Sequence, residues 1–280
     1  MRQAGRRIRG LALSCHLGPT LAVTSLTAAL AIGLGAGTRL WVLMASAVLT
    51  GQLSVGWSND WIDAERDLAI DRRSKPIVAG LIGARAVRTA AFVAAALCVP
   101  LSLATGWRAG GVHLLAVAAA WAYNVRLKST SWSWAPYALS FGLLPAFVAL
   151  ALPGHPWPAG WAIAAAGLLG VGAHLANVLP DLEDDRTTGV RGLAHRLGRT
   201  RASLLAPAAL LGATALIVLG PVGRPIEGAW AGLVVAGAIA ASGAMIALTR
   251  QHSRLPFYLT IAVAAVDVVL LVRVGPLLVW

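Results

Sequence analysis

Residues 203–220 read SLLAPAALLGATALIVLG, a run without a charged side chain, and residues 230–248, WAGLVVAGAIAASGAMIAL, are equally apolar. About 20 such residues in an α-helix cross the hydrocarbon core of a bilayer. The composition extends this conclusion to the whole chain, because 58% of its 280 residues are hydrophobic and only 12% are charged. Soluble domains carry roughly 25% charged residues. The sequence therefore predicts an all-α integral membrane protein.

Further apolar runs predict about nine transmembrane helices in one bundle, and the whole chain, 1–280, as a single domain. Alanine and glycine are frequent in these runs, which lets helices approach closely where lipid supplies no hydrophobic driving force. The predicted spans lie near 11–34, 41–57, 86–104, 107–123, 134–152, 161–179, 203–220, 230–248 and 255–272.

The basic residues are distributed unevenly between the two sides of such a bundle. Alternating the nine spans leaves only Arg39, Arg108 and Arg224 in the loops of one side, and most other Lys and Arg residues fall on the side of the N-terminus. Cytoplasmic loops carry such an excess. We therefore predict a multi-pass protein of the cell membrane with a cytoplasmic N-terminus. The net charge of +12 then reflects topology and gives no indication of a nucleic-acid partner.

The acidic residues gather in two windows at the predicted cytoplasmic ends of spans 41–57 and 161–179. Apart from Glu227 and Asp267, every Asp and Glu lies within 60–71 or 181–185, including Glu183 and Asp184. The surrounding sequences are SNDWIDAERDLAIDRRSKPIVAG (58–80) and ANVLPDLEDDRTTGVRGLAHRLG (176–198).

Both windows contain one Asn and two Asp residues at intervals of four, a spacing that places side chains along one helix face. Pro180 interrupts the second helix, so there the last member is expected on the following turn. The repeated spacing hints at two pseudo-repeat halves, about 11–133 and 134–280. The two sets are Asn59, Asp63 and Asp67, and Asn177, Asp181 and Asp185.

Carboxylates at this density repel one another unless a cation lies among them, and Mg²⁺ favours such oxygen ligands together with phosphate oxygens. Basic residues are interleaved with the acids, namely Arg66, Arg72, Arg73, Lys75, Arg186 and Arg191. The mixture suits a diphosphate whose tail lies in the bilayer. Solvated loops with internal salt bridges are the competing interpretation, which the matched spacing of the two windows disfavours.

The first window resembles the N-D-x-x-D-x-x-x-D motif of the UbiA-type intramembrane prenyltransferases, with a basic-Pro-Ile-x-x-Gly sequence at 75–80. The second is similar to their D-x-x-x-D motif followed by G-x-R-x-L-A-x-x-L-G, here 189–198. A Tyr and a Lys five residues apart in the family match Tyr123 and Lys128. The chain departs from the family at Lys75, where many members have Arg, and at Gly192, where Thr is common.

The resemblance implies a bundle around a central cavity and a Mg²⁺-dependent prenyltransferase. Such an enzyme transfers a polyprenyl group from an allylic prenyl diphosphate to a hydrophobic acceptor in the lipid bilayer, usually an aromatic or quinone-precursor ring. The metal ligands implied are Asn59, Asp60, Asp63, Asp67, Asn177, Asp181 and Asp185, of which Asp63, Asp67, Asp181 and Asp185 are expected to be catalytic. The diphosphate ligands implied are Arg72, Lys75, Tyr123, Lys128 and Arg191.

Two other functions remain open. A UbiA-like membrane terpene cyclase would ionise the same donor and capture the cation internally, without an acceptor. A cation-coupled transporter would carry its acids near the midplane on broken helices, whereas these acids lie at span ends. His174 and Asp267 lie inside predicted spans and receive no assigned role, although an intramembrane carboxylate is functional by default.

Overall fold

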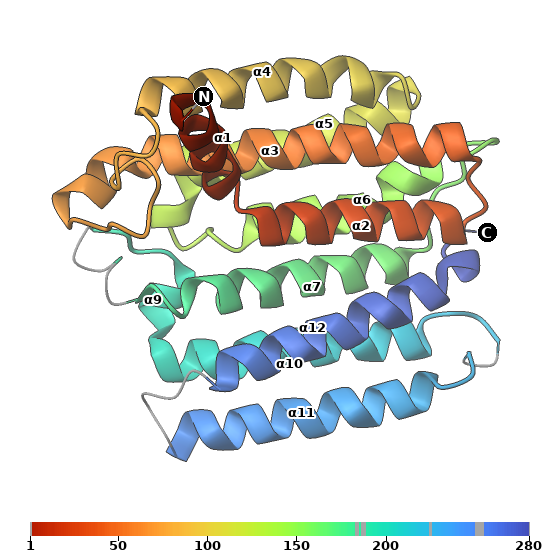
Figure 1. The fold of residues 1–280 in the computed structure, drawn as a ribbon. Helices are drawn as coiled ribbons and strands as arrows, with labels where there is room; N and C mark the ends of the chain where they lie inside the picture. Colours follow the sequence, from red (N-terminus) through yellow and green to blue (C-terminus); the bar gives the residue numbers. More distant parts are fainter. Residues whose placement is uncertain (1, 183–184, 186–188, 224–225, 250–254, 280) are drawn as a thin grey trace.

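A computed structural model describes residues 2–182, 185, 189–223, 226–249 and 255–279, and in these residues the chain is a bundle of helices lying side by side (Figure 1). The prediction of an all-helical protein is confirmed. The helices are α1 (Arg2–Ser14), α2 (Leu17–Gly33), α3 (Thr38–Ala69), α4 (Ala84–Leu103), α5 (Trp107–Val125), α6 (Ala135–Ala151), α7 (Gly160–Val178), α9 (Leu193–Leu197), α10 (Arg199–Leu219), α11 (Ala229–Thr249) and α12 (Leu255–Arg273). Short 3₁₀ turns are η1 (Leu127–Ser129) and η2 (Gly275–Leu277).

Every predicted span except 11–34 coincides with one helix in the described part of the chain. Six of these helices are long and apolar enough to cross a membrane, and the bent pair formed by α1 and α2 gives a seventh if it is one span. Helix α6 is apolar but shorter, and α5 is not among the six. The protein is a multi-pass membrane protein, and nine spans stay a prediction.

The first predicted span, 11–34, is wrong as a single helix. The chain bends by 66° between α1 and α2, and His16 at the bend has a left-handed backbone with φ of 54°. The bend packs against α3, where a Cβ on Gly56 would lie only 2.4 Å from the carbonyl oxygen of Cys15. Trp57 Nε1 also donates to the carbonyl oxygen of Leu11 at 2.9 Å. An unbroken apolar run conceals this turn, because the packing that stabilises it is tertiary.

Helix α3 has 32 residues and continues well past the predicted span 41–57. The acidic residues up to Asp67 therefore extend the same helix beyond its apolar part. The second window differs, because α7 ends at Val178, shortly before Pro180, and proline lacks a backbone N–H and disfavours the helical conformation of the residue before it. Asp185 donates its backbone N–H to the carbonyl oxygen of Asp181 at 2.9 Å in a separate turn. Glu183, Asp184 and Arg186 lie outside the described residues.

The main hydrophobic core lies at the end of the bundle opposite the acidic windows. It combines the first part of α3 with the last parts of α2, α6 and α12, through residues such as Met44, Leu30, Phe147 and Leu271. These side chains are at most 1% exposed. The helices therefore pack closely at that end of the bundle.

Asp267 belongs to the packing of the bundle. It is fully buried on α12, and Thr214 Oγ1 on α10 donates to its Oδ1 at 2.5 Å. Neither residue lines the cavity described below. The carboxyl group therefore links two helices by a polar contact inside the bundle.

Candidate active site

A cavity of about 420 Å³ lies between α2, α3, α5, α6 and α7. Both acidic windows reach it, and residues from the two halves of the sequence face one another across it. Asn124 of α5 lines it, together with six Asn and Asp residues of the two windows at one end, namely Asn59, Asp63, Asp67, Asn177, Asp181 and Asp185. Apolar residues including Val23, Val55, Ala120 and Phe141 continue the wall. The cavity is thus polar toward the acidic windows and apolar toward the core.

Asn59, Asp63 and Asp67 form a strip along one face of α3, and cations lie beside it. Asp63 forms ion pairs with both Arg66 and Lys128, and Asn59 Nδ2 donates to Asn124 Oδ1 at 3.2 Å. Lys128, in the loop between α5 and α6, is only 8% exposed. Burial lowers the pKa of Lys128, and the charge of Asp63 opposes that effect. A buried ammonium group therefore stands directly over the first carboxylate strip.

Arg72 connects the two acidic windows. Its Nη2 lies 2.5 Å from Asp181 Oδ1, and its Nη1 lies 3.7 Å from Asp67 Oδ1. Burial lowers the pKa of Arg72, but the contact with Asp181 outweighs it, so the pKa is raised overall. On the far side of the second window, His195 Nε2 lies 3.4 Å from Asp185 Oδ2. The carboxylates of both windows are thus close enough to share one phosphorylated ligand with these cations.

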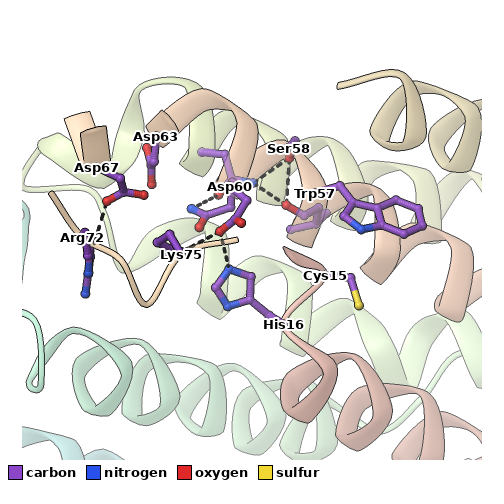
Figure 2. A network of polar contacts seen from close by, with 12 residues as sticks. Cys15, His16, Trp57, Ser58, Asp60, Asp63, Asp67, Arg72 and Lys75 are labelled. Carbon is purple, nitrogen blue, oxygen red and sulfur yellow. Dashed lines mark hydrogen bonds and ion pairs between the residues drawn. The ribbon is translucent and has the colours of Figure 1, made fainter. Parts of the chain in front are cut away.

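Asp60 is placed differently from the prediction that made it a metal ligand. It follows Asn59 by one residue, which turns its side chain about 100° around the helix, and it does not line the cavity. It is 2% exposed, and its Oδ1 accepts a hydrogen bond from Lys75 Nζ at 2.7 Å. Figure 2 shows Lys75 and His16 on either side of this carboxylate, with His16 Nε2 3.7 Å from Oδ1. Asp60 therefore positions Lys75, which does line the cavity.

The predicted diphosphate ligands divide into two groups. Arg72, Lys75, Tyr123 and Lys128 all line the cavity. Arg191 does not line it and is exposed, and its carbonyl oxygen accepts from Arg196 Nε at 3.1 Å. The second motif thus turns Arg191 outward, because buried Val190 beside it faces the cavity instead.

Tyr123, His174 and Tyr137 form an aromatic wall of the cavity, and of these Tyr137 was not predicted. The ring of His174 lies 5.0 Å from that of Tyr137 and 5.7 Å from that of Tyr123. His174 Nε2 lies 3.0 Å from Ser133 Oγ, which accepts the backbone N–H of Leu193. His174 also lines the cavity, and through Ser133 it connects α7 to the second motif.

His16 and His195 also line the cavity and were not singled out from the sequence. A histidine alone inside the apolar run 11–34 is the signal that could have indicated His16. His195 occupies a variable position of the second motif, so nothing in the sequence distinguishes it.

The donor set fits Mg²⁺, which prefers carboxylate and amide oxygens supplemented by phosphate and water. Oxygen-bearing side chains line one end of the cavity from two directions. No three acidic, histidine or cysteine side chains among the described residues already form a metal cluster. Asp63 and Asp181 are instead neutralised by Lys128, Arg66 and Arg72. Metal binding therefore requires that these cations move to another anion, and a diphosphate provides one.

The fold and the cavity define a helical membrane protein whose internal cavity is lined by charged residues at one end and by apolar residues at the other. Residues 17–273 match the model of the UbiA prenyltransferase family. The chain belongs to this family and is a prenyltransferase.

Sequence relatives and solved structures that are similar to this chain support the same family. The chain is 34% identical over 248 residues to the bacteriochlorophyll synthase 33 kDa chain of Cereibacter sphaeroides, covering 81% of this chain and 78% of the relative. It is 33% identical over 204 residues to the protein of the same name from Rhodobacter capsulatus, covering 63% and 62%. The fold is similar to that of a UbiA homolog from Archaeoglobus fulgidus bound to GPP and Mg²⁺, with a TM-score of 0.69, 17% identity, and coverage of 95% and 99%.

Proposed function

We propose that this prenyltransferase moves a prenyl group from an allylic prenyl diphosphate to a hydrophobic acceptor, with Mg²⁺ as cofactor. The proposal rests on one observation: both Asn–Asp sets line the same cavity as Arg72, Lys75, Tyr123 and Lys128. The apolar end of the same cavity suits a prenyl chain. The similar fold of the homolog bound to GPP and Mg²⁺ supports this donor and this cofactor.

The proposed residue roles follow from the cavity wall. Asn59, Asp63 and Asp67 line the cavity and would hold one Mg²⁺, and Asn177, Asp181 and Asp185 would hold a second. Bound there, Mg²⁺ supplies positive charge that neutralises the departing diphosphate.

Lys128 and Arg72 leave Asp63 and Asp181 and donate to phosphate oxygens, which adds charge-assisted hydrogen bonds to the leaving group. The allylic C–O bond breaks with its electron pair on the diphosphate. The allylic carbon then bonds to the acceptor, which loses a proton.

The names of the two relatives suggest which acceptor to test first. Both carry the name bacteriochlorophyll synthase, so we propose bacteriochlorophyllide, the pigment without its prenyl chain, as the first acceptor to test. The aromatic or quinone-precursor ring implied by the motifs is the second, represented by a hydroxybenzoate and a dihydroxynaphthoate.

The test uses the purified protein in detergent with Mg²⁺ and radiolabelled geranyl or geranylgeranyl diphosphate, with and without each acceptor. We expect Asp63→Ala and Asp181→Ala to lower the rate of diphosphate release at least about 100-fold, because each removes charge stabilisation of the leaving group. Chelation of Mg²⁺ has the same effect. The matched control is Asp71→Ala, since Asp71 is exposed, pairs with Arg73 and does not line the cavity.

Diphosphate release at the wild-type rate in both Asp63→Ala and Asp181→Ala would reject the site. Release without acceptor, with formation of a cyclic hydrocarbon, would identify a terpene cyclase. Cation flux in proteoliposomes free of prenyl substrate would favour a transporter.

A further inference from the structure

Gln52 lies on α3 below the strip of Asn and Asp residues and lines the same cavity. It precedes Asn59 by seven residues, which is close to two helical turns, so both side chains fall on nearly the same face. Along the helix axis Gln52 is roughly 10 Å deeper than Asn59. The face that presents the metal-binding oxygens thus continues toward the apolar end with an amide.

The Gln52 side chain does not take part in the hydrogen bonds that connect the described helices. Apolar residues of the same cavity wall include Val23, Ala120 and Phe141. Ser140 also lines it, but the Ser140 hydroxyl donates to the carbonyl oxygen of Ala116 at 2.8 Å. In the described part of the chain, by contrast, the Gln52 amide makes no hydrogen bond.

Gln52 is partly exposed and lines the cavity, so its amide can form a hydrogen bond with a polar ligand bound there. The prenyl chain carries no hydrogen-bonding group and cannot be that ligand. The diphosphate lies with the cations at the other end of the cavity. The remaining reactant is the acceptor.

We propose that Gln52 hydrogen-bonds a carbonyl or hydroxyl oxygen of the acceptor and thereby helps select it. The inference rests on the proposed function. Reacting atoms must approach to about 3–3.5 Å, so the nucleophilic atom of the acceptor lies beside the allylic carbon, below the metal-binding strip. The body of the acceptor then extends toward Gln52 with an oxygen directed away from the diphosphate. An acceptor without that oxygen leaves the amide unpaired and is discriminated against.

The variant Gln52→Met tests this role, because methionine matches glutamine in length but forms no strong hydrogen bond. The control is Thr50→Val on the same helix, since Thr50 Oγ1 donates to the carbonyl oxygens of Ser46 and Ala47, contacts the Cys98 thiol on α4, and does not line the cavity. The probes are bacteriochlorophyllide and a dihydroxynaphthoate, both rich in such oxygens. The measurements are the KM for each probe, the KM for the prenyl diphosphate, acceptor-free diphosphate release and the Tm in detergent.

We expect Gln52→Met to raise the acceptor KM about 3- to 10-fold, the effect of one neutral hydrogen bond. The prenyl diphosphate KM, the acceptor-free release and the Tm stay at wild-type values, as does every value for Thr50→Val. An unchanged acceptor KM, or an equal rise in the prenyl diphosphate KM, would overturn the inference. So would cyclisation without any acceptor. If the wild-type protein releases no diphosphate at all, the proposed function itself fails.

Discussion

At the residue scale, the helical interval of four predicts the cavity-lining set well, because it depends only on local geometry. Asn59, Asp63 and Asp67 share one face of α3 and line the cavity. Asp60, one residue off that interval, is buried against Lys75 instead. The partners of each carboxylate could not be predicted, since Lys128 reaches Asp63 across 65 residues of sequence. Their assignment to metal and diphosphate stays a proposal.

The buried ammonium group of Lys128 leads to a pH-dependent prediction. Burial lowers its pKa below the ordinary value of 10.5, against the opposing attraction of Asp63. Its positive charge is therefore lost at a lower pH than that of a free lysine. We expect kcat/KM for the prenyl diphosphate, which reports the free enzyme, to fall as the pH rises through this pKa.

Two variants isolate the contribution of Lys128. Lys128→Arg keeps its charge at alkaline pH, so the fall in kcat/KM moves to higher pH. Lys128→Met removes the charge at every pH and lowers kcat/KM about 10- to 100-fold. If wild type and Lys128→Arg decline at the same pH, a different group controls the alkaline side.

At the element scale, glycines determine how closely the cavity helices approach. A Cβ on Gly170 of α7 would lie 2.4 Å from the carbonyl oxygen of Tyr137 on α6. The same contact holds Tyr137 and His174 at the cavity wall. Apolar periodicity located both helices but not this contact, because it does not reveal which helices become neighbours.

We expect Gly170→Ala to lower both the Tm and the rate of prenyl transfer, because the two helices must separate to admit the methyl group. The destabilisation should be about 1–3 kcal/mol, measured by thermal unfolding in detergent. Gly111→Ala is the matched control, since Gly111 lies inside α5 with no atom within 4 Å of an added Cβ. Alanine there should be neutral or stabilising. Equal Tm values for the two variants would contradict this account of the packing.

At the scale of the whole molecule, the distribution of basic residues gives an orientation that we propose for the protein. Both acidic windows, Arg72 and Lys128 surround one end of the cavity, while the main core closes the other end. The positive-inside tendency places the end with the acidic windows in the cytoplasm. Nine spans and two pseudo-repeat halves stay predictions of the same kind.

Thiol labelling tests the orientation, because the two cysteines of the chain, Cys15 and Cys98, are both buried. In a variant lacking them, we introduce Arg73→Cys or Trp157→Cys, at positions that are 80% and 57% exposed. An impermeant thiol reagent should label Arg73→Cys only in inverted vesicles and Trp157→Cys only in right-side-out ones. The opposite pattern would reverse the orientation.

The sequence alone determined the membrane class, the positions of the helices and the two carboxylate sets, because hydropathy and helical periodicity are local properties of the chain. Only the tertiary structure decided that the chain bends at His16, that Asp60 faces Lys75 and that Arg191 points outward. It also decided that Gln52 and an aromatic wall complete the cavity. Each of these depends on which surfaces meet across distant parts of the sequence, and no local pattern records that.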